Sequence, residues 1–399
     1  VPVAESVPMF WIRVDTLAVR EGIDFTLLRE PDKGRRHRFV AMGDPQVRNR
    51  RELSQLDSLL AALKRTVAQL PASSEIPVLV AGDIVFTVGL GRPVFYAIVN
   101  HDHGPIRDSE TPANEEPATR RFREHYGPTY YSFNRGRVHY IVLDNIRFRG
   151  GKRDAYDIGF GEEQLAWVER DLSYVPKKRA VVGLVHAPLQ SRQFPDPEHY
   201  GDSSALLALL DGYARVQIIS GHTHCNSVAT PSRRVTEHTV GAACGGFWEG
   251  PVCLDGTPLG YKLFEVRGRR FRWRYVAAAA PERLFSVYPP DTSRCGASRP
   301  ASELLVNVWD WDPQWRVEYS EDGGRTFRPM KRCGYDDLRA LDPVACEYFG
   351  TAGSPRIAAR PWIKARVTDH LFRCTPRSER VTIRVVSRFG ETRTQQVDL

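Results

Sequence analysis

Long hydrophobic runs are absent from this 399-residue chain. No uninterrupted apolar stretch approaches the roughly 20 residues that a membrane helix needs, so we expect no transmembrane segment. No internal repeat or low-complexity tract is found, and 42% hydrophobic with 26% charged residues is typical of a globular protein. The N-terminus, Val1–Glu5, has neither an initiator methionine nor a signal peptide, and we interpret the chain as processed or trimmed.

Lysine is scarce, with 8 lysines against 48 arginines. The net charge of +8 and the pI near 9.2 would suit a nucleic-acid partner, because basic surfaces attract polyphosphates. The arginines, however, are spread over the whole length and form no stripe in the sequence, and an arginine-rich codon bias explains them more simply. We therefore expect no nucleic-acid partner.

Cysteine is confined to the C-terminal half, at positions 225, 244, 253, 295, 333, 346 and 374, and no two cysteines form a CxxC pair. This spacing disfavours a structural zinc cluster and leaves disulfides open, with Cys244–Cys253 and Cys333–Cys346 as the pairs nearest in sequence. An oxidising compartment is favoured, so we expect a periplasmic or secreted protein.

The predicted elements divide the chain into three regions. Residues 1–36 hold two short alternating runs, 9–14 and 23–28, and a charged linker, which is too little for a domain. Residues 37–282 alternate strands with helices and then continue as strands alone, which suggests two packed sheets with helices outside. Residues 283–399 hold short strands and predict a small β-sandwich.

Within the middle region, hydrophobic periodicity predicts helices and strands at definite places. Helices are expected at 53–70, 162–172 and 204–210, and a hairpin at 129–145 that turns at 134–136. Residues 104–126 are expected to be a polar insertion. Strands are expected at 37–43, 77–81, 94–99, 180–185, 216–219, 236–241, 260–266 and 271–276.

Metal-compatible side chains follow several of these strands. In an extended segment after residue 219, His222 and His224 would share one face, and Gly221 would let the backbone leave the sheet. Because each candidate follows a strand, all can converge on one sheet edge. The others are Asp44, Gln46, Asp83, Asn100, His101, Asp102 and His186.

This set supplies mixed nitrogen and oxygen ligands for two divalent ions about 3.5–4 Å apart, with Asp83 as the natural bridge. Two cations can hold phosphate oxygens and lower the pKa of a bridging water, so that hydroxide attacks phosphorus in line.

The order of these motifs resembles the calcineurin-like metallophosphoesterase superfamily, whose pattern is D-x-H, GD, GNH followed by an acid, H, and GHxH. The match covers about residues 37–280, with Asp44-Pro45-Gln46, Gly82-Asp83, Val99-Asn100-His101-Asp102, His186 and Gly221-His222-Thr223-His224. Segments 126–133 and 241–248 further resemble a bacterial subgroup in which β domains flank the catalytic domain. The resemblance implies an α+β fold, a four-layer αββα sandwich with a C-terminal β-sandwich, and makes residues 1–36 the remnant of an N-terminal β domain.

The same resemblance implies roles for these residues. His101 would contact the phosphate and protonate the leaving oxygen, oriented by Asp102. Two divalent ions, of Mn, Fe, Zn or Mg, would be the cofactors. One would be held by Asp44, Gln46, Asp83 and His224, and the other by Asp83, Asn100, His186 and His222.

Two positions depart from the family pattern. Gln46 stands where most members have His, and an amide oxygen is a harder and weaker donor for late first-row ions. This favours Mn²⁺, Mg²⁺ or Fe²⁺ over Zn²⁺ at that position, and we expect Gln46 still to coordinate. Val99 replaces the usual Gly, which affects the local turn but no ligand.

Further residues are candidates for substrate contacts. Arg48 and Arg51 could clamp a phosphate, with solvated arginines at a helix start as the alternative. Five further residues could line a pocket for the non-phosphate part of the substrate, and the alternative is that they pack in the core. They are His103, Tyr130, Tyr131, Phe247 and Trp248. Trp309, Trp311 and Trp315 are expected in the sandwich core and not in a sugar-stacking platform.

These features predict a metal-dependent phosphoric ester hydrolase that acts on a small-molecule or envelope phosphate ester, with phosphomonoesterase activity favoured. A phosphodiesterase, including a nuclease, would use the same metal centre. A different class of protein is a further alternative, namely a non-catalytic scaffold whose β domains bind a cell-surface glycan or lipid.

Overall fold

The computed structural model describes residues 35–70, 76–82, 93–103, 115–149, 156–190, 200–290, 302–334, 340–351 and 362–399. The strands expected at 9–14 and 23–28 and the ligand candidate Asp83 lie outside these described residues.

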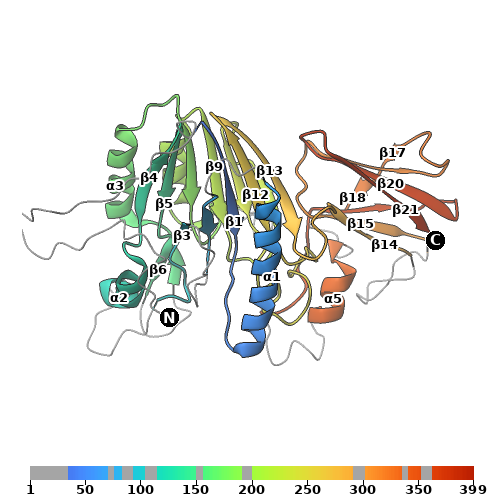
Figure 1. The fold of residues 1–399 in the computed structure, drawn as a ribbon, viewed down its shortest axis with the longest axis horizontal. Coiled ribbons are helices and arrows are strands. Elements are labelled where there is room, and N and C mark those ends of the chain that lie inside the picture. The colour runs from blue at the N-terminus through green and yellow to red at the C-terminus, as the bar shows by residue number, and fades with distance from the viewer. Residues whose placement is uncertain are drawn as a thin grey trace, which may run out of the picture.

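Two sheets face each other in the larger part of the molecule (Figure 1). The first has the order β13-β12-β1-β2-β3, with β1 (Arg36–Met42), β2 (Val78–Val80), β3 (Val94–Tyr96), β12 (Gly260–Arg267) and β13 (Arg270–Ala277). The second has the order β10-β11-β9-β8-β5-β4, with β4 (Tyr131–Arg135), β5 (Val138–Val142), β8 (Ala180–Leu184), β9 (Arg215–Ser220), β10 (Ser227–Ala229) and β11 (Val235–Thr239).

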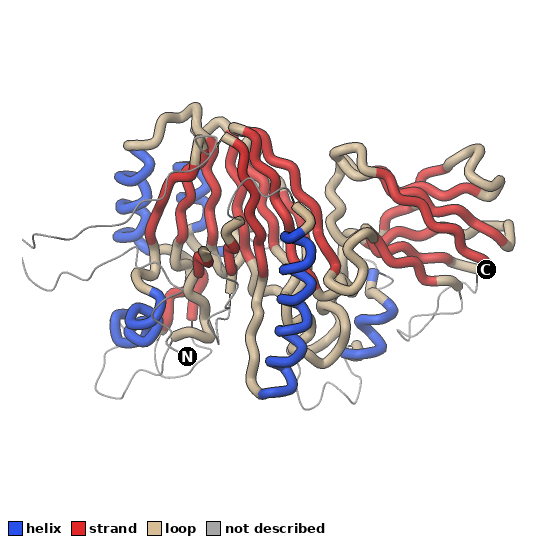
Figure 2. Tube along the Cα trace, viewed as in Figure 1, coloured by secondary structure: helices blue, strands red, loops and turns tan. Residues whose placement is uncertain are grey.

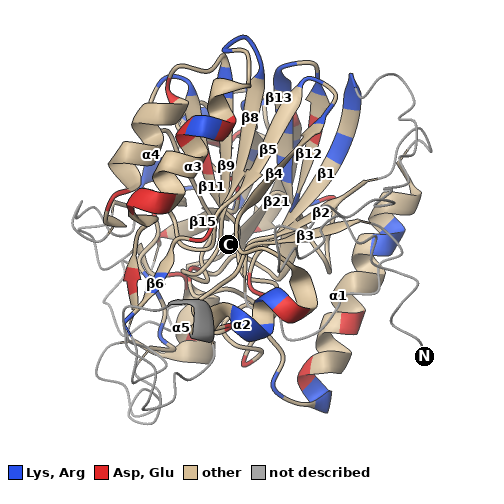
Figure 3. Ribbon diagram, turned by 90° about the vertical axis from the view of Figure 1, so that its left-hand side faces the viewer, with Lys and Arg blue, Asp and Glu red and all other residues tan. Residues whose placement is uncertain are grey.

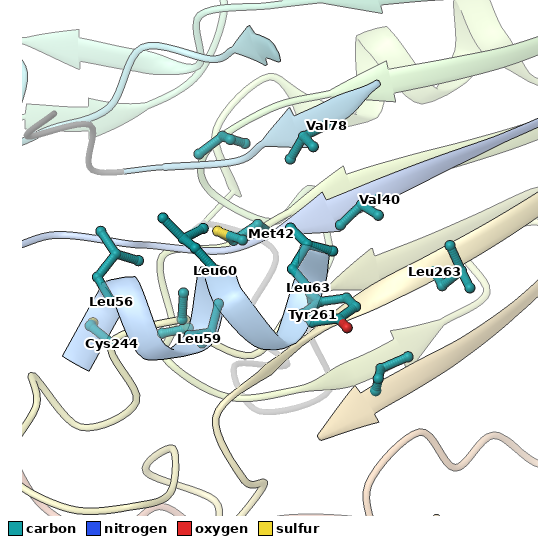
Figure 4. Packing of buried hydrophobic residues seen from close by; sticks show 14 of the residues in the cluster. Val40, Met42, Leu56, Leu59, Leu60, Leu63, Val78, Cys244, Tyr261 and Leu263 are labelled. Carbon is teal, nitrogen blue, oxygen red and sulfur yellow. The ribbon is translucent and has the colours of Figure 1, made fainter. Parts of the chain in front are cut away.

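Helices cover the outer faces of both sheets (Figure 2). The leucine stripe of α1 (Arg50–Ala68) packs on Val40, Met42 and Val78 of the first sheet (Figure 4). Helices α3 (Gly161–Ser173) and α4 (Ser203–Leu210) pack on the second sheet. Because side chains alternate along a strand, Phe39 and Ala41 point the other way, into the layer between the sheets. The four-layer αββα sandwich expected from the sequence is confirmed.

The parallel direction of the central strands determines where the candidate site lies. β1, β2 and β3 run parallel to one another, and so do β5, β8, β9 and β11. Chain segments that leave the carboxyl ends of parallel strands emerge at the same edge of a sheet, which is where ligand sites form in such sheets.

The C-terminal region is a sandwich of two four-stranded sheets. One is β14 (Phe285–Tyr288), β15 (Leu304–Val308), β19 (Leu371–Cys374) and β18 (Lys331–Arg332), and the other is β17 (Arg328–Pro329), β16 (Arg316–Ser320), β20 (Arg380–Val386) and β21 (Thr392–Asp398). Trp315 lies in the sandwich core and Trp311 packs against it, as expected. For Trp309 the expectation is wrong, because it is buried against Tyr275 and Ala277 of β13.

Buried polar contacts join the sandwich to the two-sheet part. Lys262 Nζ lies 2.8 Å from Asp310 Oδ1, and both side chains are almost fully buried. Asn226, two residues after His224, donates its side-chain N–H to the carbonyl of Trp309. The two parts therefore share an interior.

Several elements were not expected. Helix α2 (Glu115–Tyr126) lies within the expected polar insertion, and α5 (Pro343–Phe349) lies in the C-terminal region, for which a β-sandwich was expected. A small hairpin of β6 (Ile146–Phe148) and β7 (Tyr156–Ile158) follows β5. Among the described residues, no helix is long and apolar enough to cross a membrane.

Both suggested disulfides are wrong. Cys253 Sγ donates to the carbonyl of Ala242 at 3.5 Å and Cys244 Sγ to that of Gly245 at 3.6 Å, so both are thiols. Cys346 is disulfide-bonded, but Cys333 is a thiol and cannot be its partner. Nearness in sequence did not indicate which cysteines form disulfides.

Candidate metal centre

The loops that follow β1, β3, β8 and β9 meet at one edge of the two sheets. They carry Asp44, Asn100, His186 and His222, and contacts of 3.8 Å or less join these four residues through side-chain or backbone atoms. The predicted convergence of strand ends is therefore present in the structure.

Three donor atoms meet around His186. Its Nε2 lies 2.8 Å from Asn100 Oδ1 and 3.0 Å from His222 Nδ1. Its other nitrogen, Nδ1, lies 2.8 Å from the carbonyl oxygen of Ala81, which can only accept a proton. Nδ1 therefore carries the hydrogen, and the lone pair of Nε2 faces Asn100 Oδ1 and His222 Nδ1. This orientation is found in metal-binding histidines.

A second group forms around His224. The amide nitrogen of Gln46, Nε2, lies 2.9 Å from His224 Nε2, and His224 Nδ1 donates to the carbonyl of Gly245 at 2.7 Å. The ring of Phe247 stacks on the imidazole, with centroids 4.3 Å apart. His222 and His224 thus face different partners, as two separate ligand groups would require.

The Asp44 carboxylate is fully buried beside the first group. It accepts the backbone N–H of His222 at 3.0 Å, and its Oδ1 lies 3.8 Å from His186 Nδ1. Burial raises the pKa of Asp44 to about 7, although the hydrogen bond from His222 opposes this effect. A buried carboxylate of this kind is stabilised as an anion by a nearby cation.

Both buried imidazoles are neutral at neutral pH. Burial, and then the charge of His222, lowers the pKa of His186 well below its usual value. Burial lowers the pKa of His224 to about 4, and the charges of His101 and Arg366 act in the same direction. Neutral imidazole is the form that binds a metal ion.

The backbone is unusual at this edge. Among the described residues, the non-glycine positions with positive φ are Asp44, His222, His224, Phe247 and Trp248, all of them in the site loops. Such conformations cost free energy and gather at functional sites. The expectation of an extended segment is therefore wrong: His222 (φ 70°) and His224 (φ 54°) lie in a left-handed turn after β9.

Glycine is required here for space. A Cβ on Gly221 would lie 2.7 Å from Asp44 Oδ2, and a Cβ on Gly82 would lie 2.5 Å from Asp44 Oδ1. Neither contact is sterically possible without a shift of the backbone or the carboxylate. The two glycines let the chain close around both oxygens of Asp44.

The donor set fits divalent ions. No group of three or more His, Cys, Asp and Glu side chains suited to a metal is found in the described ranges. Two of the converging donors are amides, Gln46 and Asn100, and the expected bridge, Asp83, follows Gly82 just outside those ranges. Neutral imidazoles, amide groups and a buried carboxylate together suit hard to borderline divalent cations.

His101 and Asp102 follow Asn100 in the loop after β3. The charge of His101 contributes to the lowered pKa values of both His186 and His224, so it lies near both ligand groups. Burial and the charge of Asp102 raise the pKa of Tyr126 to about 12.

The four residues suggested for substrate contacts have different surroundings. Arg48 pairs with Glu52 at 2.8 Å and donates to the carbonyl of Phe247, while Arg51 is exposed on the first turn of α1. His103 is buried and stacks on Phe148, which is core packing. Trp248 is also buried, and its indole N–H donates to the carbonyl of Gln46, so it positions this loop instead of lining a pocket.

Sequence reasoning missed two residues that touch the centre. Asn145 accepts the backbone N–H groups of His186 and Ala187 at 3.2 and 3.1 Å, and so fixes the loop after β8. It lies three residues after the end of β5, and this position just beyond a strand was an available signal. Tyr156 places its hydroxyl 3.4 Å from His222 Nε2, and nothing in the sequence around it indicated this contact.

The family described as the C terminal of calcineurin-like phosphoesterase matches residues 237–392. The match covers less than half of the chain, and over these residues it supports the resemblance to calcineurin-like metallophosphoesterases that the sequence motifs indicated. The matched part of the chain begins in β11 and ends at the start of β21. No curated protein matches the chain.

Solved structures similar to this chain include three proteins of low sequence identity. A dimetal phosphatase from Danio rerio is 15% identical with a TM-score of 0.42, over 61% of this chain and 96% of that chain. GAP50, the anchor in the inner membrane complex of Plasmodium, is 15% identical with a TM-score of 0.38, over 62% and 86%. A 5'-nucleotidase from Candida albicans is 13% identical with a TM-score of 0.38, over 63% of this chain and 53% of that chain.

Proposed function

We propose that this metallophosphoesterase hydrolyses a phosphate ester with two divalent metal ions, and that a phosphomonoester is its preferred substrate. The observation that carries the proposal is the convergence of His186 Nε2 with Asn100 Oδ1 and His222 Nδ1, at 2.8 and 3.0 Å. A second, separate donor group lies at Gln46 and His224.

Each of the two ion positions would use residues from different loops. When bound, two divalent ions neutralise phosphate oxygens and lower the pKa of water. One position would be formed by Asp44, Gln46, Asp83 and His224, and the other by Asp83, Asn100, His186 and His222.

The residues of the chain orient these ligands and move a proton. The carbonyls of Ala81 and Gly245 hold the Nδ1 hydrogens of His186 and His224, which directs both Nε2 lone pairs inward. His101, whose charge acts on both imidazoles, would donate a proton to the leaving oxygen of the ester.

The preference for a monoester is supported by charge at the rim of the site. Arg48 donates to the carbonyl of Phe247 at 3.0 Å, and Phe247 stacks on His224. A phosphomonoester is a dianion and gains more from a nearby guanidinium than a singly charged diester does.

A periplasmic or secreted location belongs to the same proposal. Cys346 is disulfide-bonded, and disulfides persist in oxidising compartments.

Paired assays on an aryl phosphate and a bis-aryl phosphate, with Mn²⁺, Fe²⁺ or Zn²⁺ added, test the activity. We expect a higher kcat/KM for the monoester. In His101→Ala, kcat should fall about 100-fold or more because the general acid is lost. His125→Ala, which removes an exposed histidine of α2, is the matched control and should leave kcat unchanged.

Faster cleavage of the diester would make the phosphodiesterase alternative correct. Two bound metal ions with no turnover of either ester would contradict the enzymatic proposal and favour the non-catalytic scaffold.

A further inference from the structure

Lys and Arg residues gather at the edge of the two sheets where the parallel strands begin (Figure 3), opposite the candidate metal centre at the carboxyl ends of these strands. In the first sheet, Arg36 at the start of β1 pairs in register with Arg267 at the end of β12. Arg267 in turn pairs with Arg270 at the start of β13. All three side chains are exposed.

The second sheet continues the same edge. Lys178 precedes β8, and Arg215 begins β9 beside Ala180 of β8. The guanidinium of Arg269, in the turn between β12 and β13, donates to the carbonyl of Lys178 at 3.4 Å and so joins the two edges. We call this surface the basic rim, made of Arg36, Lys178, Arg215, Arg267, Arg269 and Arg270.

Nearby carboxylates do not neutralise the basic rim. Glu265 pairs with Arg38 at 3.0 Å, and Asp171 lies 2.7 Å from His139 Nε2. Within the described residues, no ion pair involves a member of the rim. The positive charge of this edge is therefore available to an outside partner.

The spread of arginine along the sequence had suggested that no concentrated basic surface exists. The fold shows otherwise, because the starts of β1, β9 and β13 and the end of β12 lie side by side although they are far apart in sequence. The rim is a property of the sheet topology.

We propose that the basic rim binds the surface of an anionic phospholipid bilayer. Each arginine or lysine near such a surface strengthens binding about fivefold, and the effect adds over several residues. Tyr174, which is 81% exposed at the end of α3, lies three residues before Lys177, and tyrosine suits the bilayer interface.

Nucleic acid fits the same charge less well. The rim consists of strand starts and a hairpin turn that Arg269 fastens to Lys178, so it offers no projecting helix or ribbon for a groove. With the rim on a bilayer, the metal centre at the opposite edge would stay open to substrate.

Vesicle binding by the full chain, measured by sedimentation, tests the proposal. The chain should bind vesicles that contain phosphatidylglycerol, bind vesicles of phosphatidylcholine alone far more weakly, and detach as salt rises. A rim variant that lacks four of these charges should lose about 600-fold in affinity, the product of about fivefold for each charge. It carries Lys178→Gln, Arg215→Gln, Arg267→Gln and Arg270→Gln, all exposed positions.

A control variant with the same loss of charge should bind like the unmodified chain. It carries Arg316→Gln, Arg325→Gln, Lys331→Gln and Arg377→Gln, which are exposed on the C-terminal sandwich. Equal losses in both variants would show an effect of net charge alone and overturn the proposal. The proposal would also be overturned if the unmodified chain did not bind vesicles that contain phosphatidylglycerol. Tighter binding to duplex DNA than to these vesicles at the same salt concentration would overturn it as well.

Discussion

Asp44 is the residue whose surroundings constrain the site most tightly. One carboxylate oxygen faces Gly82 and the other faces Gly221, each at a distance that leaves no room for a methyl group. The same carboxylate accepts the backbone N–H of His222. The position of the proposed ligand Asp44 and the left-handed turn at His222 therefore depend on each other.

Gly221→Ala should disturb the candidate metal centre while the protein still folds. The added Cβ would lie 2.7 Å from Asp44 Oδ2, so the turn must move and the bond between His222 N–H and Asp44 must lengthen. We expect loss of bound metal and activity, with a cost in stability of about 1–3 kcal/mol. Metal analysis and circular dichroism measure the two effects.

Gly334→Ala is the matched control, since a Cβ there meets nothing within 4 Å. Equal metal content in Gly221→Ala and Gly334→Ala would show that this turn does not need glycine.

At the residue scale, the sequence predicted which side chains meet but not how the backbone presents them. Asn100, His186 and His222 could be identified because each follows a strand of a largely parallel sheet. The left-handed conformations of His222 and His224 could not, because they depend on Asp44, almost 180 positions away along the chain. The packing roles of His103 and Trp248 likewise depend on partners distant in sequence, apart from the local bond of His103 to Val99.

Helix α1 follows directly after the loop that carries Asp44 and Gln46. Its N-cap residue Asn49 accepts the backbone N–H of Glu52 at 3.1 Å, and the Glu52 carboxylate accepts the backbone N–H of Arg48. This reciprocal capping holds the segment that leads from Gln46 into the helix.

Asn49→Ala should destabilise the protein by about 1 kcal/mol because the Glu52 N–H loses its acceptor. The thermal midpoint should fall by about 2 °C, while Asn49→Ser, which keeps an acceptor, should stay close to the original value. Identical midpoints for the two variants would mean that the cap contributes no stability.

Elements with a wide apolar stripe were predictable, and short or polar ones were not. Helix α1 buries Leu56, Leu59 and Leu63 on one face, which gives a clear period. Helix α5 has seven residues, and only Asp342 before Pro343 marks its start. Its Phe349 packs with Cys225 and Leu254 of the two-sheet part, so tertiary contacts stabilise it.

At the scale of the whole molecule, the C-terminal sandwich takes part in building the metal centre. The backbone N–H of Arg366 donates to the carbonyl of Leu254, and Leu254 donates to the carbonyl of His224. Asn226 connects the same loop to Trp309. A sandwich was predictable from its short strands, but this attachment was not, because it joins segments more than 80 residues apart.

We propose that His222 and His224 bind two different metal ions, and the metal content per chain measures this. We expect about two divalent ions in the unmodified chain and about one in each of His222→Ala and Gln46→Ala, since each removes a donor from one group only. Gln314→Ala, an exposed amide on the sandwich, is the control. Two ions retained in both site variants would contradict the account, as would the loss of both ions from either one.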